Sequence, residues 1–234
     1  MQKESIDKIS LEVAILRFPG TNCEFDTQYA FEKLGHKTTL VWHENKKLPE
    51  NINLLVIPGG FSYGDYLRSG SIARFSPIMK AVLEYAKNNG KILGICNGFQ
   101  ILTEAGLLPG ALKRNNNLHF ISKHQNLVVI NNNNSFLNLC QKNEVLDIPI
   151  AHADGNYYID DAGLDDLEKN GQILLRYSDA SGKPVVVNGS VTSIAGVCNK
   201  ERNIFGLMPH PERALEAILG SQDGIRMLQG FESL

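Results

Sequence analysis

Residues 91–105 read KILGICNGFQILTEA, in which a short apolar stretch runs directly into a helical pattern. The first five of these residues predict a buried strand, and residues 97–105 predict the helix that follows it. Cys96 stands between them in the pattern Gly-x-Cys-x-Gly, where small neighbours let the backbone turn sharply. The stretch therefore predicts a strand–turn–helix unit that projects a cysteine over the carboxyl edge of a sheet.

The chain before this stretch repeats the alternation of strand and helix. Strands are predicted at residues 11–16, 37–42 and 54–57, and helices at residues 25–34 and 77–89. Strands that alternate with helices form parallel βαβ units. We therefore expect an α/β fold with an open, doubly wound, mostly parallel sheet flanked by helices.

The pattern changes after residue 111, because turn signals rather than helices separate the apolar runs. Antiparallel strands added to the same sheet are predicted at residues 127–130, 173–176, 184–187 and 194–197, and terminal helices at residues 212–219 and 224–231. The asparagine runs 115–117 and 131–134 are predicted to be exposed turns without a function. Residues 1–10 are predicted to be an N-terminal extension of a single domain, residues 11–234.

Composition excludes several classes of protein. The 234 residues hold 23 basic and 25 acidic side chains, a formal net charge of −2, which argues against a basic nucleic-acid binder. A hydrophobic content of 43% is too high for a disordered chain. No apolar run approaches the ~18 residues that cross a bilayer, and the N-terminus has no signal-peptide pattern. We expect a cytoplasmic protein that contacts neither nucleic acid nor membrane.

The four cysteines are too widely spaced for a zinc-binding Cys-x-x-Cys pair, so free thiols and no metal site are expected. Cys96 is the candidate nucleophile, because a thiol at a helix N-terminus is favoured as the thiolate. The N–H of Asn97 would then face an oxyanion on the attacked carbonyl. A buried structural cysteine is the alternative for Cys96, and Cys23 is a rival nucleophile that lacks the flanking glycine.

A cysteine nucleophile needs a base, and His210 is the candidate. It stands in Pro209-His210-Pro211-Glu212, where two prolines restrict the backbone and a carboxylate can hold the imidazole tautomer. Cys96, His210 and Glu212 would form a catalytic triad. The alternative is a loop histidine that the prolines merely stiffen.

Two further segments are candidate parts of the same site. Residues 58–62, PGGFS, follow a buried strand, and the N–H of Gly60 is the candidate second oxyanion donor. A plain turn is the alternative. His152 and Ala153 follow an apolar run and could form a wall of the substrate pocket, against the alternative of a hydrogen-bonded turn histidine.

The other four histidines, at positions 36, 43, 119 and 124, are predicted to lie at the surface. Neither Gly-x-Gly-x-x-Gly nor Gly-x-x-x-x-Gly-Lys-Ser/Thr occurs in the chain, so no phosphate-binding loop is expected.

Several of these motifs together carry a resemblance to a known family. Residues 94–100, GICNGFQ, with residues 209–212, PHPE, resemble the class I, triad-type glutamine amidotransferases. Residues 17–23, RFPGTNC, and 59–68, GGFSYGDYLR, are similar to members that serve purine biosynthesis as glutaminase subunits. The resemblance extends from about Leu11 to Gly230 and implies the flavodoxin-like fold of that family.

The resemblance also implies a reaction. Cys96 would attack the side-chain amide of glutamine, a glutamyl thioester would form, and His210, supported by Glu212, would protonate the departing ammonia. Gly60 and Asn97 would make the oxyanion hole, and Gln100 would hold the substrate.

A larger synthetase subunit would bind ATP, Mg²⁺ and formylglycinamide ribonucleotide and receive the ammonia, with a small bridging subunit beside it. This chain would bind no cofactor. Phe61 to Arg68 and Arg213 flank the expected site and would face the partner.

Asp154 departs from the family pattern, since a glutamate is commoner at this place. Two other functions remain open: a noncatalytic module that kept the fold, and a stand-alone cysteine hydrolase.

Overall fold

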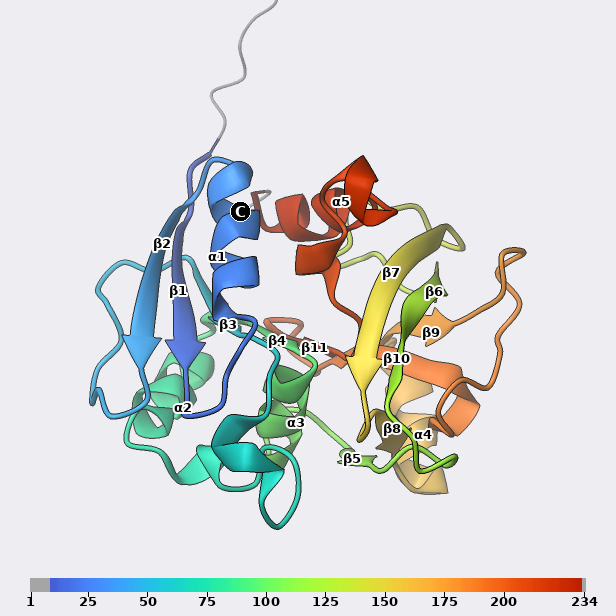
Figure 1. Cartoon of the computed structure of the whole chain (residues 1–234), viewed down its shortest axis with the longest axis horizontal. Coiled ribbons are helices and arrows are strands. Elements are labelled where there is room, and N and C mark those ends of the chain that lie inside the picture. Colours follow the sequence, from blue (N-terminus) through green and yellow to red (C-terminus); the bar gives the residue numbers. More distant parts are fainter. Residues whose placement is uncertain (1–8, 233–234) are drawn as a thin grey trace, which may run out of the picture.

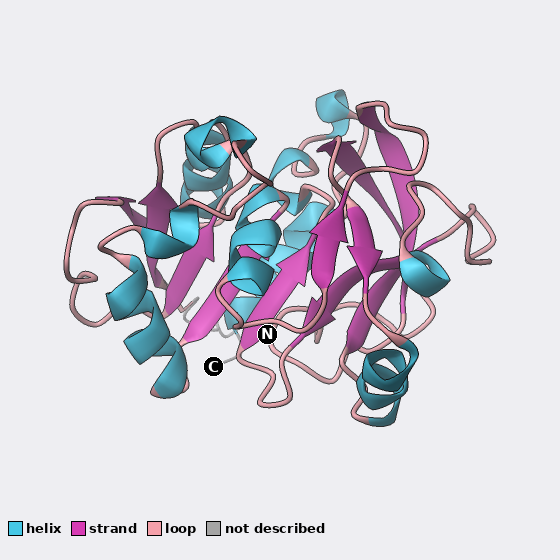
Figure 2. Ribbon diagram, turned by 90° about the horizontal axis from the view of Figure 1, so that it is seen from below, coloured by secondary structure: helices cyan, strands magenta, loops and turns pink. Residues whose placement is uncertain are grey.

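The computed structural model describes residues 9–232 of the chain, which form a nine-stranded sheet with helices on both of its faces (Figures 1 and 2). The predicted extension, residues 1–10, lies outside the described residues except for its last two. The strand order is β2-β1-β3-β4-β11-β10-β9-β6-β7, and β5 and β8 form a separate two-stranded sheet.

The strands of the large sheet are β1 Glu12–Arg17, β2 Lys37–Trp42, β3 Leu54–Ile57, β4 Lys91–Ile95, β6 Ile121–Val129, β7 Val145–His152, β9 Ile173–Tyr177, β10 Ile194–Cys198 and β11 Ile204–Leu207. The small sheet pairs β5 Ala111–Lys113 with β8 Asn156–Tyr158. The helices are α1 Glu24–Lys33, α2 Met79–Lys87, α3 Asn97–Glu104, α4 Asp161–Lys169 and α5 Gly224–Gln229.

Five neighbouring strands, from β2 to β11, run parallel, and the four from β10 to β7 are antiparallel. Every side chain of β3, β10 and β11 is buried, as expected for strands covered on both faces. The predicted α/β class, with its parallel half and its added antiparallel strands, is therefore confirmed.

The pairing of β11 with β4 is the feature of the sheet that positions the site. It is parallel, with Gly206 opposite Gly94 and Leu207 opposite Ile95, so the two strands end at the same edge. The N–H of Cys96 extends the pairing by one bond, because it donates to the carbonyl of Leu207 over 2.8 Å. The turn after β4 and the turn after β11 must therefore lie side by side.

Two elements were predicted wrongly. Residues 212–219 are not a helix: two short 3₁₀ turns, Pro211–Arg213 and Ala217–Leu219, are separated by extended backbone at Glu216. Residues 184–187 are not a strand, because only Pro184 forms an isolated bridge, to Ser178, and Val186 is 82% exposed. Pro184 has no N–H for the ladder, so pairing with β9 stops after one bond, from the N–H of Val185 to the carbonyl of Tyr177. Val185 and Val187 pack against the core without strand pairing.

Two of the histidines predicted at the surface are also buried. His36 and His43 are 5% and 9% exposed, and the His43 ring packs edge-on against Tyr63, whose hydroxyl contacts His43 Nδ1 over 2.8 Å. His119 and His124 are exposed, as predicted. Polar loops can cover a histidine as well as expose it, so the local composition misjudged the first two.

The asparagine runs divide in the same way. Asn131, Asn132 and Asn134 bond to backbone carbonyls of their own and neighbouring turns while staying partly exposed. Asn115 is instead fully buried and holds the segment around His152, so the expectation that it is an exposed residue without a role is wrong.

The glycines around Cys96 allow a test of how tightly the strand–turn–helix unit is packed. A Cβ added to Gly98 would lie 1.8 Å from the carbonyl oxygen of Ile57 in β3, and neither backbone can move without separating α3 from the sheet. We expect Gly98→Ala to lower the free energy of unfolding by about 3 kcal/mol or more, as measured by urea denaturation.

The matched control is Gly106→Ala, at a glycine with φ +71° where an added Cβ meets no atom within 4 Å. It should cost only the ~1 kcal/mol of a left-handed alanine. Equal losses in the two variants would show that backbone conformation, not helix-to-strand contact, sets the cost at residue 98.

Candidate active site

Cys96 lies at the turn between β4 and α3, where the sequence predicted it. Its φ of +51° and ψ of −105° are unusual for a residue with a side chain, and such strain persists only where the surroundings fix it. The surroundings here are glycines: a Cβ on Gly94 would lie 2.8 Å from the backbone of Gly98, so the strand and the helix touch directly. The turn thus has the geometry of a nucleophile elbow.

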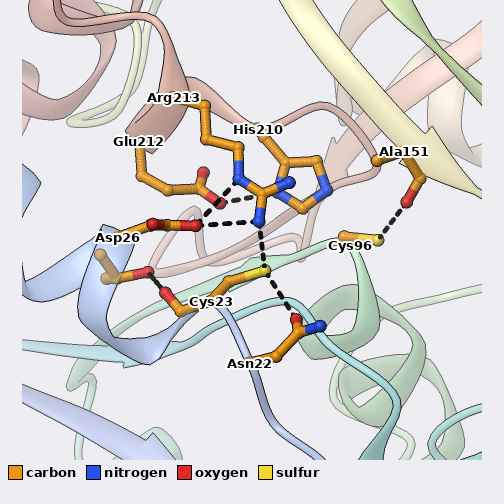
Figure 3. A network of polar contacts seen from close by, with 9 residues as sticks. Asn22, Cys23, Asp26, Cys96, Ala151, His210, Glu212 and Arg213 are labelled. Carbon is orange, nitrogen blue, oxygen red and sulfur yellow. Dashed lines mark hydrogen bonds and ion pairs between the residues drawn. The ribbon is translucent and has the colours of Figure 1, made fainter.

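His210 and Glu212 follow β11 at the same edge of the sheet (Figure 3). Both are almost fully buried, and His210 Nδ1 lies 2.6 Å from Glu212 Oε1. The backbone N–H of His210 donates to the carbonyl of Pro149 in β7, which fixes the loop from a second side. The imidazole is therefore oriented by its own carboxylate and by a neighbouring strand.

Three side chains converge on Gly59, which has no side chain of its own. A Cβ built there would lie 2.8 Å from His210 Cε1, 3.0 Å from Cys23 Sγ and 3.4 Å from Cys96 Cβ. The nucleophile and the base that the sequence predicted are therefore neighbours, and a second thiol lies beside them. Cys96 Sγ itself points to the carbonyl of Ala151, at 3.7 Å.

The electrostatics of His210 come from its buried neighbours. Burial by itself lowers the pKa of this imidazole, but the negative charges of Glu212 and Cys96 outweigh it and raise the pKa well above the ordinary value. A histidine in this setting can hold a proton taken from a thiol while Glu212 stabilises the imidazolium.

A cavity of about 150 Å³ opens onto these groups. Its wall includes Cys96, His210 and Gly60, and the half-exposed rings of Phe61 and Phe120 stand at its opening with their centroids 6.5 Å apart. Larger hollows elsewhere on the described surface, up to about 730 Å³, are lined by neither a cysteine nor a histidine.

The candidate oxyanion donors come from two segments, and only Gly60 is among the residues that line the cavity. Asn97 follows Cys96 and begins α3, and the N–H groups of the first turn of a helix have no intrahelical acceptor. Gly60, with φ +143°, is bridged to Thr21 and has no room for a Cβ, which would lie 2.7 Å from the N of Asn22.

The side chain of Asn97 ties the two donors together. Its Oδ1 accepts a bond of 3.1 Å from the N–H of Ser62, two residues after Gly60, and its Nδ2 donates to Gln100 Oε1 over 2.9 Å. The segment it holds contains three successive residues with positive φ, Tyr63, Gly64 and Asp65. The Asn97 side chain therefore fixes the strained loop at residues 63–65, which follows the candidate donor Gly60.

Gln100 and the segment 152–155 form one hydrogen-bonded unit that follows Ala151, and none of these residues is among those that line the cavity. Gln100 Nε2 donates to the carbonyl of Asp154 over 2.7 Å, so the two predicted substrate-binding regions are in direct contact. Ala153 is half-buried in this turn, and its carbonyl accepts from the N–H of Asn115. Because Gln100 bonds to the main chain of residue 154, this contact does not depend on whether the side chain there is aspartate or glutamate.

His152 ends β7 and is 2% exposed. The amide of Asn115 is oriented by two carbonyls that accept from its Nδ2, those of His119 and His152, and by the N–H of Gly155, which donates to its Oδ1. His152 Nδ1, at 3.2 Å from the same Oδ1, must then be the protonated nitrogen.

The other ring nitrogen of His152 is consequently a bare acceptor. Burial lowers the pKa of His152 to about 4, with help from the positive charge of His210, so the ring is neutral near pH 7. Its Nε2 is buried without a hydrogen-bond partner among the described residues. Asn115, which the sequence suggested to be an exposed turn residue, is thus the residue that sets this tautomer.

Cys23, the rival nucleophile, lies at the N-cap of α1 rather than at an elbow. Arg213 Nη2 donates to its Sγ over 3.1 Å, and Arg213 is held in turn by Asp26 at 2.8 and 3.0 Å (Figure 3). Sequence reasoning named Cys23 and Arg213 separately and missed their contact, because the two residues are 190 positions apart in the chain.

Known proteins share both the sequence and the fold of this chain. Residues 10–224 match the CobB/CobQ-like glutamine amidotransferase domain. The chain is 65% identical over 221 residues to phosphoribosylformylglycinamidine synthase subunit PurQ of Sulfurimonas denitrificans, covering 94% of this chain and 99% of the relative. It is 57% identical to the Campylobacter jejuni protein of the same name, covering 94% and 96%.

A solved structure, that of PurLQS from Thermotoga maritima, contains a similar chain. The TM-score is 0.85 at 41% sequence identity, and the match covers 95% of this chain and 98% of that one. The fold and the sequence therefore agree over almost the whole length.

The loop held by Asn97 contains a carboxyl group that gives a pH dependence. Burial raises the pKa of Asp65 to about 6, and the charge of Asp154 adds to this shift, against a hydrogen bond from Ser69. Because the folded state binds this proton more tightly than the unfolded state, the group favours folding at low pH, and this contribution is lost as the pH rises from about 4 through 6.

We therefore expect Asp65→Asn to gain stability relative to the parent chain as the pH rises from 4 to 7. Since Asp65 is only partly buried, the gain should be no more than about 1 kcal/mol. Thermal unfolding of both proteins across this range measures it. A difference between the two that does not change with pH would contradict the shifted carboxyl group.

Proposed function

The chain belongs to the CobB/CobQ-like glutamine amidotransferase family, and we propose that Cys96, His210 and Glu212 are the triad with which it hydrolyses glutamine. It is a glutaminase subunit of phosphoribosylformylglycinamidine synthase, an enzyme of purine biosynthesis, as its similarity to the curated relatives supports. The observation that carries the proposal for the triad is the meeting of Cys96 and His210 at Gly59, with Glu212 2.6 Å behind the imidazole.

The first half of the reaction forms a thioester. His210 takes the thiol proton of Cys96, and the sulfur attacks the carboxamide carbon of glutamine, so that a C–S bond forms and the carbonyl becomes an oxyanion. The N–H groups of Gly60 and Asn97 stabilise that charge, which is worth several kcal/mol in a site that excludes water. The C–N bond then breaks, and His210 gives its proton to the departing nitrogen, which leaves as ammonia.

The second half restores the enzyme. A water molecule gives a proton to His210 and attacks the thioester carbon, a second oxyanion forms at the same donors, and the C–S bond breaks to release glutamate. His210 returns the proton to the sulfur. Glu212 accepts the hydrogen bond of the Nδ1 proton throughout, so that Nε2 faces the reacting atoms.

We assign the rest of the pocket to substrate recognition. Gln100 and the His152–Gly155 turn, which follows Ala151 of the cavity wall, would form a polar surface for the substrate, with Ala153 in the middle of the turn. The bare Nε2 of His152 is a preset acceptor for a hydrogen bond from an N–H group, and glutamine supplies both an amide and an ammonium. Because burial keeps this ring neutral, it does not compete with His210 for the proton.

Ammonia must reach a second active site before it escapes as ammonium, so a synthetase subunit completes the enzyme. The similar chain in PurLQS supports such a partner. The curated relatives are named PurQ, and the name PurLQS adds the letters L and S to that name. We place ATP, Mg²⁺ and formylglycinamide ribonucleotide on the synthetase and no cofactor on this chain, which has no phosphate-binding motif. A small bridging subunit is the third component that we expect.

Two loops that meet at the cavity carry exposed apolar side chains suited to this partner. Phe61 and Phe120 line the cavity. Tyr66 and Leu67 follow Phe61 in the loop after β3, and Leu118 precedes Phe120 in the segment before β6. Tyr66 is 74% and Leu67 91% exposed, and exposed aromatic and apolar groups are typical of an interface. We call these five residues the collar, and docking on it would close the cavity to solvent.

Arg68 and Arg213 were both expected at this interface, and they differ. The Arg68 side chain is 62% exposed and forms a bidentate pair with Glu104, so it can contact a partner as part of that pair. Arg213 is half-buried and engaged with Asp26 and Cys23. We therefore assign Arg68, and not Arg213, to the partner surface.

The compartment that we propose is the cytoplasm. All four cysteines are free and buried, which suits a chain that works among reduced thiols. No helix among residues 9–232 is long and apolar enough to cross a membrane.

The two other functions considered from the sequence are less well supported. A noncatalytic module has no need of a strained elbow or of a buried His–carboxylate pair beside it. A stand-alone hydrolase has no need of an apolar collar around its cavity.

The triad is tested by separating glutamine from ammonia as nitrogen donor. In the complex with its synthetase, Cys96→Ala should abolish glutamine-dependent synthesis and leave ammonia-dependent synthesis intact, because only the thioester step needs the sulfur. Glu212→Gln should lower the glutamine-dependent rate about a thousandfold, since an amide cannot hold the imidazole in the required state. A glutamine-dependent rate that survives in Cys96→Ala would overturn the assignment, and labelling by a glutamine-like electrophile would then identify the true nucleophile.

The collar is tested by a charge placed on it. Leu67→Asp should weaken binding to the synthetase at least tenfold, measured by calorimetry, because a carboxylate would be desolvated in an apolar contact. Val186→Asp, in an exposed loop between β9 and β10, is the matched control and should bind normally.

The partner should also stimulate glutamine hydrolysis strongly, since hydrolysis by the free subunit would waste glutamine. Equal binding by the two aspartate variants, or equal hydrolysis with and without synthetase, would count against this assignment of the surface.

A further inference from the structure

Glutamine hydrolysis by the triad leaves one thiol of the cavity unused. Cys23 is 2% exposed, lines the cavity and lies against the same imidazole as Cys96. Its Sγ accepts from Arg213 Nη2 over 3.1 Å and donates to Asn22 Oδ1 over 3.2 Å. Burial raises the pKa of this thiol, so it is a neutral group in a polar, enclosed position.

Cys23 forms a compact set of donors with the two residues of the triad that follow β11. Its Sγ, a ring nitrogen of His210 and a carboxylate oxygen of Glu212 all lie within 4.8 Å of one another. The three side chains come from two places in the fold, the N-terminus of α1 and the turn after β11 (Figure 3).

One oxygen of this set has no partner. Glu212 Oε2 is buried and has no hydrogen-bond partner among the described residues. His210 Nε2 also has none there, but it lies on the ring edge opposite Glu212, so a cation bound to Glu212 would take Nδ1 of His210. Both residues are at most 3% exposed, so bulk water does not replace the missing partners. An unpaired buried polar atom is costly and marks a place where a proton or a cation can be bound.

We propose that Cys23, His210 and Glu212 form a binding site for a borderline-soft divalent cation, of which Zn²⁺ is the type, and that its occupation inhibits glutamine hydrolysis. Sulfur, imidazole nitrogen and carboxylate oxygen are the three ligand types that zinc prefers, and three protein ligands leave one position for water. The bound ion displaces the thiol proton of Cys23 and the proton on the ligating nitrogen of His210, so that one divalent charge replaces two protons.

The surroundings suit this ion better than the other divalent cations of the cell. Mg²⁺ and Ca²⁺ need six or more oxygen ligands, and this set offers only one carboxylate. Arg213 can keep its hydrogen bond to the bound sulfur, and its own charge is already balanced by Asp26. A synthetase that works with Mg²⁺ would therefore leave this site free.

Cys96 is not a ligand in this proposal, and this gives the test its sharpest contrast. The simpler alternative is that Zn²⁺ bridges the nucleophile and the base, Cys96 and His210, as it could in any cysteine hydrolase. If Cys23 is the ligand, removing Cys96 leaves the ion bound, whereas if Cys96 is the ligand, removing Cys23 changes nothing.

The experiment measures metal binding on the full chain, by calorimetry with Zn²⁺ and by absorption with Co²⁺, whose charge-transfer band reports thiolate ligation. Four proteins are compared: the parent chain, Cys23→Ser, Cys96→Ala, and Cys140→Ala as a control at a buried cysteine outside the cavity. We expect one ion per chain with a thiolate band in the parent, in Cys96→Ala and in Cys140→Ala, and at least tenfold weaker binding without the band in Cys23→Ser.

Loss of the band in Cys96→Ala, or its persistence in Cys23→Ser, would overturn the proposal. If Cys23→Ser does not fold, the Cys96→Ala and Cys140→Ala spectra decide, because a thiolate band that persists in both must come from Cys23 or Cys198. Cys198 is fully buried in β10 and belongs to no candidate metal group among the described residues.

The inhibitory effect rests on the proposed triad and is measured separately. In the complex, Zn²⁺ should inhibit glutamine-dependent synthesis at concentrations that leave ammonia-dependent synthesis unchanged, and a chelator should restore the rate. Relative to its own uninhibited rate, Cys23→Ser should need at least tenfold more Zn²⁺. Binding without inhibition would leave the metal site standing and refute the role of His210 and Glu212, whereas inhibition unchanged in Cys23→Ser would refute the site.

Discussion

The parallel pairing of β4 with β11 determines where every reacting group lies. The two strands are far apart in the sequence, yet their register ends them at one edge, with the N–H of Cys96 bonded to the carbonyl of Leu207. The nucleophile follows the end of β4 and the base follows the end of β11. The carboxyl edge of the strands is where open α/β sheets bind their ligands. The bond from His210 to Pro149 attaches the antiparallel half of the sheet to the same place, so both halves of the molecule hold the imidazole.

Chemistry at this edge depends on strain that the packing maintains. Cys96 and the loop at Tyr63 to Asp65 have positive φ, at a cost of about 1–3 kcal/mol for each non-glycine residue. Two contacts maintain these conformations. The backbone of α3 packs directly against β3 at Gly98, and the Asn97 side chain accepts a hydrogen bond from the loop. An enzyme that used ordinary backbone here would place neither the sulfur nor the oxyanion donors in the cavity.

The local part of this arrangement could be predicted from the sequence, and the nonlocal part could not. Five adjacent residues, 94–98, predict the elbow at Cys96. The spacing of the apolar residues predicts the alternation of strands and helices in the first half of the chain. β11 was missed, because Ile204–Leu207 is only four residues long and has no crossover helix after it to mark it as parallel. The burial of Asn115, and the meeting of Cys23 with Arg213, depend on contacts between distant segments, for which composition holds no signal. Two local motifs predicted Cys96, His210 and Glu212 as a triad, the resemblance to a family supplied its reaction, and the structure supplied its neighbours.

Gly59 contributes no side-chain atom to the reaction, yet three reactive side chains come within 3.4 Å of the point where its Cβ would be. The catalytic centre therefore depends on the absence of a Cβ at residue 59. Any side chain at this position would push the His210 ring away from Cys96, although every reactive residue would still be present in the sequence. A homologous chain could therefore keep its complete set of chemical groups and still be inert, so an inventory of the triad is an insufficient criterion for activity within such a fold.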